Sequence, residues 1–462
     1  METDALVIGA GPGGYVAAIR AGQLGQDVAL VEKDAYGGVC LNHGCIPSKA
    51  LLSATSLAER AASAGHMGID AEVSIDVPQL LDWTDGVVDK LTGGVEQLCR
   101  HNGVDLVEGH AAFVDRSTVR VEGGDVDRIS FEDAIVATGS RPIELPGFAF
   151  DDDPVWSSRD ALSPERVPDR LLVVGAGYIG MELSNVYARL GSDVTVVEAL
   201  DSALPAYEDD VTAIVRDRAA ELGVDFQFGE AAQGWTEAGD GIRVTTESED
   251  GDSHGYDADR VLVAVGREPV TGTVGLEQVG IEPDADGFIG TNRYGETGVD
   301  GIYAVGDVAG EPLLAHAAST EGILTAHHAA GEPLDVGDWI VPAAVFTDPE
   351  IGTVGMTAEA ADAAGFEPAV GTMPYSASGR ALTADETEGF VRVVADEPSG
   401  ALLGAQVVGP EASELVAELA FAIRQRATLD DLAGTIHVHP TLSETVMEAA
   451  EQAMGQAIHT RN

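Results

Sequence analysis

Two cysteines near the N-terminus have a spacing that suggests redox chemistry. Cys40 and Cys45 are two of the chain's three cysteines, and Lys49, one of its three lysines, follows in the same stretch. On a regular helix, positions five residues apart have Cα atoms roughly 8–9 Å apart, whereas a disulfide needs less than about 7 Å. We therefore expect the helix to be distorted between them, at Gly44 and Pro47. A strained or exposed disulfide is easily reduced, which favours a catalytic pair over two structural thiols.

The composition is strongly acidic. The 462 residues include 78 Asp and Glu against 25 Lys and Arg, which gives a formal net charge of -53. Such a charge repels nucleic acids and anionic membranes, so we expect neither as a partner. The acidic residues are spread along the chain and do not form one disordered tail. They predict a hydrated surface adapted to high salt, a halophilic source, and a folded state weakened at low ionic strength.

Length and cysteine use restrict the class of protein further. The chain is long enough for three domains of ordinary size. A strand is expected at residues 5–8, and no apolar run reaches membrane-spanning length, so we expect a cytoplasmic protein without a signal peptide. Three cysteines cannot build a disulfide scaffold, which supports the catalytic interpretation of the pair. Cys99 is expected to be a core thiol, and no metal site is expected.

A glycine-rich turn between two strands predicts a dinucleotide-binding unit. Gly9, Gly11 and Gly14 form a GxGxxG motif after the first strand, and the second strand, 28–31, runs into Glu32. The glycines allow a tight turn and a close approach of the backbone to a pyrophosphate at the helix N-terminus. Glu32 can accept hydrogen bonds from a ribose.

A second unit repeats this motif with the same spacing. Gly175, Gly177 and Gly180 follow a strand, and the next strand, 194–197, ends in Glu198. In both units the glutamate lies 23 residues after the first glycine (9 to 32 and 175 to 198). A carboxylate at this point accepts the 2′-hydroxyl of a ribose and repels a 2′-phosphate, so we expect NAD and not NADP.

The remaining patterns predict an α/β fold of two Rossmann-like dinucleotide-binding domains and a C-terminal α+β dimerisation domain. The apolar strand and small-residue turn of 134–142 recur at 261–269, which marks the second unit as an insert. Asp307 follows a strand at 302–305, where its carboxylate can bond a polyol or simply cap a helix. Helices are expected over 50–65, 79–102 and 411–426, strands over 390–395 and 402–408, and domains over 1–143 with 271–340, 144–270, and 341–462.

Together these residues resemble the flavin-dependent pyridine nucleotide–disulfide oxidoreductases over essentially the whole chain, and among them most closely the dihydrolipoamide dehydrogenases. The most specific segments are 40–49 and 439–444. The resemblance implies a homodimer formed by the last domain, with FAD on the first unit and NAD on the second. It implies that FAD contacts Gly9, Gly11, Gly14, Glu32, Lys49, Ala111, Thr138, Gly139, Asp307 and Ala315. It implies that NAD contacts Gly175, Gly177, Gly180, Glu198 and Gly266.

The resemblance also implies a reaction, the oxidation of dihydrolipoamide or a lipoyl-bearing protein with reduction of NAD. A 2-oxoacid dehydrogenase complex is a further partner that it allows. His439, oriented by Glu444, would take a proton from the substrate thiol in the other subunit's site. The resulting thiolate would attack Cys40, and Cys45 would pass the electrons to FAD.

Two charged residues complete the expected active site. By the family's pattern, Glu182 is placed to pair with Lys49 near the flavin. The chain uses arginine for nearly all other basic positions, which suggests that a compact charge is needed at Lys49. His43 lies where the family commonly has an apolar residue. It either shifts the pKa of the thiols or faces solvent.

An NAD(P)H-dependent reductase of another low-molecular-weight disulfide is the main alternative. Mercuric reductases and large thioredoxin reductases carry a C-terminal redox group, whereas this chain has no cysteine after Cys99. Glutathione reductases usually prefer NADP, which Glu198 disfavours. A non-catalytic flavoprotein scaffold is a different class, and turnover of the purified dimer with dihydrolipoamide would exclude it.

Overall fold

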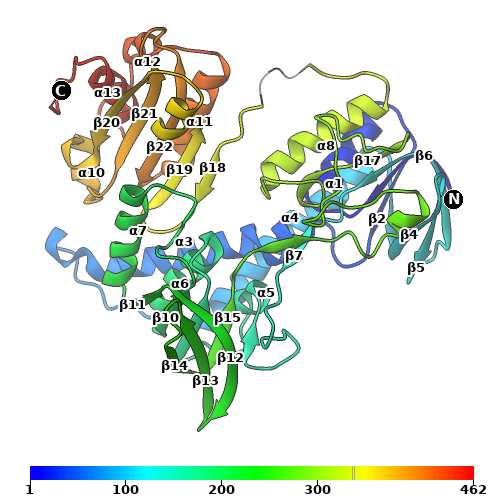
Figure 1. Cartoon of the computed structure of the whole chain (residues 1–462), viewed down its shortest axis with the longest axis horizontal. Coiled ribbons are helices and arrows are strands. Elements are labelled where there is room, and N and C mark those ends of the chain that lie inside the picture. Colours follow the sequence, from blue (N-terminus) through cyan, green and yellow to red (C-terminus); the bar gives the residue numbers. More distant parts are fainter. Residues whose placement is uncertain (336, 338, 462) are drawn as a thin grey trace. The chain divides into compact units, whose positions relative to one another are not determined.

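The computed structural model describes residues 1–335, 337 and 339–461 (Figure 1). The chain folds as two compact units. The first consists of Met1–Pro168 and Arg260–Asp335, and the second of Asp169–Asp259 with the described residues of 337–461. Each glycine-rich motif therefore belongs to a different unit. The finer domain boundaries expected near residues 143, 270 and 340 stay a prediction.

A mostly parallel sheet forms the centre of the first unit. Its strand order is β3-β2-β1-β6-β5-β4, and β17 also pairs with β6. The pairs β1–β2, β1–β6, β2–β3 and β6–β17 are parallel, whereas β4–β5 and β5–β6 are antiparallel. The strands are β1 (Glu2–Ile8), β2 (Val28–Glu32), β3 (Val104–Glu108), β4 (His110–Asp115), β5 (Thr118–Glu122), β6 (Arg128–Val136) and β17 (Ile302–Ala304).

The apolar run in β1 follows from burial on both faces of this sheet. Ala5 and Val7 belong to one apolar cluster, with side chains of α1 and α4, and Leu6 and Ile8 belong to another. A strand covered on both faces needs no polar alternation. In Figure 1, α1 and α8 lie side by side over the sheet. The helices of this unit are α1 (Pro12–Gln23), α2 (Gly38–His43), α3 (Cys45–Ser63), α4 (Val77–His101), α5 (Ser158–Leu162) and α8 (Ala315–Ala329).

The repeated strand-and-turn pattern corresponds to a pair of short strands at the borders of the insert. β7 (Ser140–Pro142) pairs antiparallel with β16 (Arg267–Pro269). Next to them, β8 (Val155–Trp156) pairs parallel with β15 (Arg260–Val263). The two copies of the sequence pattern are therefore neighbours in space.

The second unit contains the other glycine-rich motif on a second parallel arrangement, of order β11-β10-β9, and an antiparallel sheet of order β12-β13-β14. The parallel strands carry the same strand–turn–helix–strand order as the first unit. The elements are β9 (Arg170–Val174), α6 (Tyr178–Arg189), β10 (Asp193–Glu198), α7 (Asp209–Glu221), β11 (Val224–Phe228), β12 (Glu230–Ala238), β13 (Gly241–Ser248) and β14 (Ser253–Ala258).

The C-terminal part of the second unit is an antiparallel sheet of order β18-β19-β22-β21-β20, packed with α11 and α13 around one apolar core. The strands expected at 390–395 and 402–408 are confirmed as β21 and β22. The elements are β18 (Ala343–Val345), β19 (Glu350–Gly355), α9 (Ala358–Ala363), β20 (Pro368–Pro374), α10 (Gly379–Ala384), β21 (Phe390–Asp396), β22 (Leu402–Gly409), α11 (Ala412–Arg424), α12 (Leu429–Gly434) and α13 (Glu444–Ala453).

The predicted fold class is confirmed, with two dinucleotide-binding units and an α+β C-terminal part. Within the described residues, none of the helices combines the length and apolarity needed to cross a membrane.

Candidate active site

The expected FAD residues of the first unit come from one edge of its sheet. Ile8 lies level with Val31 on β2 and Val136 on β6, and Val136 lies level with Ala304 on β17. These strands are parallel, so their carboxyl ends meet at the same edge, where parallel sheets bind ligands. Four of the predicted residues follow these ends directly or closely, namely Gly9, Glu32, Thr138 and Asp307.

The glycine-rich turn leaves room beside the N-terminus of α1. Gly9 has φ +100°, and a Cβ on Gly14 would lie 1.8 Å from the Gly9 carbonyl oxygen, so both positions require glycine. A Cβ on Gly11, the N-cap of α1, would meet no protein atom within 4 Å. The Ala10 N–H donates to Glu32 Oε2 at 2.7 Å. The turn therefore fits a pyrophosphate at the helix N-terminus and a carboxylate next to the ribose position.

The other expected flavin contacts lie in the same unit. The Ser140 hydroxyl donates to Asp307 Oδ2 at 2.5 Å, and Nε of Arg267 donates to the same hydroxyl at 2.7 Å. Thr138 donates its hydroxyl hydrogen to the Val270 carbonyl oxygen at 2.6 Å, and Gly139 has φ +70°. The two alanines expected at the flavin also belong to this unit: Ala111 is buried on β4, and Ala315 is the first residue of α8.

Ser140 and Arg267 were missed as site residues by sequence reasoning. Arg267 lies beside the predicted Gly266, but the sequence carried no sign that Ser140 reaches a carboxylate 167 positions away.

The second unit reproduces the turn of the first. Gly175 has φ +103°, a Cβ on Gly180 would lie 2.0 Å from the Gly175 carbonyl oxygen, and a Cβ on Gly177 would meet nothing within 4 Å. The Ala176 N–H donates to Glu198 Oε2 at 2.7 Å, as the Ala10 N–H does to Glu32. This site therefore fits a second dinucleotide with a free 2′-hydroxyl. Gly266 belongs to the first unit, between β15 and β16, and its contact with NAD stays a prediction.

The cysteine segment is broken at one of the two predicted positions. Cys40 lies in α2 and Cys45 begins α3, and Gly44 between them has φ −145° and ψ −114°, outside the helical region. The expected distortion at Pro47 is wrong, because α3 runs from Cys45 to Ser63 through it. Pro47 lies in the first helical turn, where its missing N–H would have no intrahelical partner.

Cys40 and Cys45 are both thiols in this structure, and their side chains share a hydrogen bond. This bond raises the pKa of the Cys40 thiol, and burial raises it further, while the positive charge of Lys49 opposes both. Cys40 therefore keeps its proton, and a negative charge on the pair falls to Cys45. Cys45 begins a helix of 19 residues and Lys49 follows it by one turn, two features that stabilise a thiolate.

The predicted C-terminal base forms its expected pair. Nδ1 of His439 lies 2.9 Å from Glu444 Oε1, and the Thr441 N–H donates to Glu444 Oε2 at 2.9 Å. Burial alone would raise the pKa of Glu444, but the hydrogen bonds from Thr441 and His439 outweigh it and lower that pKa. A carboxylate can only accept, so Nδ1 carries the proton and Nε2 is left to accept one. The His439 side chain is 82% exposed, which suits a base that acts on an incoming substrate.

The remaining predicted residues have separate environments. Glu182 is buried on α6 and accepts a hydrogen bond from the Phe346 N–H at 2.9 Å. Glu182 and Lys49 belong to different units, so their pairing stays a prediction. Nε2 of His43 lies 3.8 Å from Asp34, and burial with the charge of Arg159 lowers the pKa of His43 despite that carboxylate. Within the described residues, no group of three or more His, Cys, Asp or Glu side chains could hold a metal ion.

Cys99 is buried in the core of the first unit, as predicted. Burial raises the pKa of its thiol to about 11. At neutral pH it is therefore a protonated core thiol.

Three features define the class of protein. They are a glycine-rich dinucleotide turn that occurs once in each unit, a pair of thiols at the start of a helix, and a histidine–carboxylate pair. The chain belongs to the pyridine nucleotide–disulphide oxidoreductase family, whose main domain matches residues 3–322 and whose dimerisation domain matches residues 341–450. The C-terminal part of the second unit is therefore a dimerisation domain.

Similar proteins carry a more particular name. The chain is 63% identical to the dihydrolipoyl dehydrogenase of Haloferax volcanii and 60% identical to that of Halobacterium salinarum, with 100% of this chain and 98% of each relative covered. Among solved structures it is similar to LpdA from Mycobacterium tuberculosis, with a TM-score of 0.90, 30% identity, and coverage of 97% of this chain and 99% of that one. The expected family is confirmed, and the relatives from halophilic archaea agree with the halophilic source that the charge predicts.

Proposed function

We propose that the chain catalyses the NAD-dependent oxidation of dihydrolipoamide to lipoamide through a Cys40–Cys45 redox pair. The observation that carries the proposal is the hydrogen-bonded thiol pair at the start of α3, in the unit that holds the first dinucleotide turn. The names and identities of the halophilic relatives support it. The substrate is free dihydrolipoamide or a lipoyl-bearing protein, and a 2-oxoacid dehydrogenase complex is the wider partner.

The thiol chemistry needs one base and two sulfurs. Nε2 of His439, from the other subunit of a homodimer, takes the proton of one substrate thiol, while Glu444 holds the ring by its Nδ1–H. In the oxidised form of the pair, the substrate thiolate attacks the Cys40 sulfur of the Cys40–Cys45 disulfide, and Cys45 leaves as a thiolate. The second substrate thiol then displaces Cys40, which leaves with that thiol's proton as a Cys40 thiol, and the cyclic disulfide closes. The substrate thus loses two electrons and two protons, and the cysteine pair gains the two electrons.

The cofactor sites fit this flow of electrons. The first turn would hold FAD and the second turn NAD, and these groups would supply the two-electron redox chemistry for which Cys45 is the donor among the chain's own residues. Lys49, one turn from Cys45, stabilises the thiolate, and Glu182 is proposed to orient Lys49. Asp307 and Glu32 would bond hydroxyl groups of FAD, and Glu198 would bond the ribose of NAD.

A cytoplasmic location is part of the proposal, because the NAD that the reaction consumes is supplied there. In that compartment thiols are kept reduced, and the disulfides that do form are usually transient and catalytic. This suits a pair that cycles with each turnover.

The direct test is steady-state turnover of NAD with dihydrolipoamide in molar KCl, compared with glutathione and other dithiols. We expect dihydrolipoamide to give the highest kcat/KM. The Cys45→Ser variant should keep its bound FAD, since the residues expected to hold FAD are unchanged, yet lose dihydrolipoamide–NAD turnover. Cys99→Ser is the matched control and should keep its activity.

Two results would contradict the proposal. Full turnover by Cys45→Ser would exclude the cysteine relay. Faster NADH-dependent reduction of another small disulfide would instead favour a reductase, by analogy with the structurally similar HOCl-induced flavoprotein disulfide reductase of Escherichia coli (TM-score 0.87, 26% identity, 97% of this chain and 99% of that chain covered).

A further inference from the structure

One helix of the second unit places two buried charges on a single face. α6 begins after Gly177, the open glycine of the second turn, and carries Glu182 and Arg189. These residues are seven positions apart, so they lie two turns apart on the same side of the helix. Each side chain is only 3% exposed. Buried charges are costly unless they are paired, so their partners determine how this helix is held.

Both charges contact the same short loop of the dimerisation domain. The loop, residues 346–349, connects β18 to β19. Its Phe346 N–H donates to Glu182 Oε1 at 2.9 Å, and its Asp348 carboxylate accepts from Nη2 of Arg189 at 2.5 Å. The loop thus donates a hydrogen bond to the carboxylate on α6 and accepts one from the guanidinium on α6.

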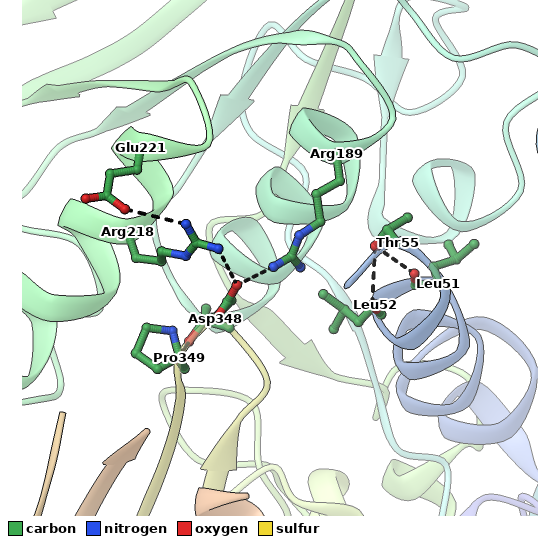
Figure 2. A network of polar contacts seen from close by, with 9 residues as sticks. Leu51, Leu52, Thr55, Arg189, Arg218, Glu221, Asp348 and Pro349 are labelled. Carbon is green, nitrogen blue, oxygen red and sulfur yellow. Dashed lines mark hydrogen bonds and ion pairs between the residues drawn. The ribbon is translucent and has the colours of Figure 1, made fainter. Parts of the chain in front are cut away.

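A second arginine strengthens this junction, as Figure 2 shows. Nη2 of Arg218, on α7, lies 3.3 Å from the same Asp348 oxygen that Arg189 contacts, and Nη1 of Arg218 lies 3.5 Å from Glu221. The loop is stiff, because Thr347 is buried and donates its hydroxyl hydrogen to the Pro349 carbonyl oxygen at 2.8 Å. One carboxylate therefore links two helices of the dinucleotide-binding part to the dimerisation domain.

A separate set of contacts fixes the start of α7 to the same domain. Arg392, on β21, contacts Glu208 and Asp210, and Gln406, on β22, donates to Glu208. The chain has 25 basic residues against 78 acidic ones. Three of these few basic residues nevertheless form ion pairs at this junction, namely Arg189, Arg218 and Arg392.

We propose that Asp348 is a positioning residue for the dinucleotide of the second unit, acting through Arg189, while the separate bond from the Phe346 N–H to Glu182 stays in place. The two contacts fix α6 to the dimerisation domain, and the N-terminus of α6 is where the pyrophosphate of NAD would lie. The inference rests on the proposed function, because it concerns the NAD step of that reaction. Loss of the Asp348 charge weakens NAD binding and leaves the thiol chemistry of the first unit unchanged.

The test uses the FAD-loaded dimer of Asp348→Asn, which keeps the size of the side chain and removes its charge. We expect the KM for NAD and the Kd for NADH, measured by fluorescence titration, to rise about tenfold. The KM for dihydrolipoamide and the anaerobic rate of flavin reduction by dihydrolipoamide should stay within about twofold. Asp217→Asn is the matched control, since Asp217 is an exposed carboxylate on α7, next to Arg218 in the sequence, that pairs with the neighbouring Arg216.

Several outcomes would overturn the inference. An unchanged KM for NAD and an unchanged Kd for NADH at equal flavin content would do so, and so would an equal loss in both half-reactions. If Asp348→Asn fails to fold, Arg218→Gln tests the same junction from its more exposed side, with an expected rise of about threefold in the Kd for NADH. Wild-type protein that lacks dihydrolipoamide–NAD turnover would contradict the proposed function alone, because the NADH titration would still decide the role of Asp348.

Discussion

His439 and Glu444 have geometry suited to a base that handles one proton at a time. The carboxylate is held by the Thr441 N–H and by the ring, and its pKa is lowered by these bonds against the effect of burial. Glu444 therefore stays ionised at neutral pH and favours the protonated form of the ring once Nε2 has taken the substrate proton. In the proposed reaction the pair acts on the substrate thiol, and neither residue is among those expected to hold FAD.

The His439→Gln variant should separate these roles. We expect kcat for dihydrolipoamide oxidation to fall about a thousandfold, as for the loss of a general base, while the absorbance of bound flavin is unchanged. The measurements are steady-state turnover and the visible spectrum of the purified dimer. His66→Gln, at an exposed position of the first unit, is the control. Near wild-type turnover in His439→Gln would exclude the histidine as the base.

At the same scale, the sequence predicted the cysteine break only in part. The distance between helical positions five residues apart required a break between the cysteines, and Gly44 is that break. Pro47 did not add a second one, because a proline in the first helical turn has no N–H bond to lose. The Ser140–Asp307 bond could not be predicted, because 167 positions separate its partners and neither lies in a pattern that points to the other.

The elements that form the dinucleotide sites were largely predictable. A GxGxxG turn between two apolar strands is compatible with few structures other than a dinucleotide-binding turn. The first glycine needs a positive φ, and a Cβ on the third glycine would collide with the carbonyl oxygen of the first. Element boundaries were less certain. The helix expected at 50–65 begins earlier, at Cys45, because the first five residues of α3, which include Pro47, show no helical apolar periodicity. The contact of α6 with residues 346–349 was not predictable, since it joins residues 164 positions apart.

The Gly177→Ala variant tests the second turn as an element. A methyl group there meets no protein atom, so the free energy of unfolding should change by no more than about 1 kcal/mol, the usual range for an N-cap substitution. The methyl group would occupy the space expected for the pyrophosphate, so the KM for NAD should rise about tenfold or more. Flavin content should be unchanged, because the other turn belongs to the first unit.

The comparison for this variant is Gly272→Ala, an open glycine outside both turns. It should keep the wild-type KM for NAD. A Gly177→Ala protein that binds NADH as tightly as wild type in a fluorescence titration would show that the dinucleotide does not pass this glycine.

For the whole molecule, charge is the property that the sequence defines most directly. A net charge of -53 is independent of any detail of packing, so its consequence for solvation was predictable before the fold was known. What composition could not indicate is where the few basic residues lie. Arg189 is nearly fully buried at the junction within the second unit, and its ion pair with the 36% exposed Asp348 side chain is screened by salt less than a fully exposed pair would be. The repulsion among exposed surface carboxylates, in contrast, is screened by the ions of the salt.

The stability of the dimer should therefore rise with KCl concentration. The range over which charges repel falls from about 30 Å at 0.01 M salt to about 3 Å at 1 M, so the self-repulsion of the carboxylates is largely removed. We expect Tm, measured by calorimetry on the FAD-loaded dimer, to rise by roughly 10 °C or more between 0.1 and 2 M KCl, several times the shift that 1 kcal/mol produces in a domain of ordinary size. A parallel series in sucrose at constant low salt is the control for preferential exclusion, and it should give a smaller rise, because sucrose leaves the charges unscreened. If Tm is independent of KCl, or if sucrose matches it, repulsion among surface carboxylates is not what limits this fold at low salt.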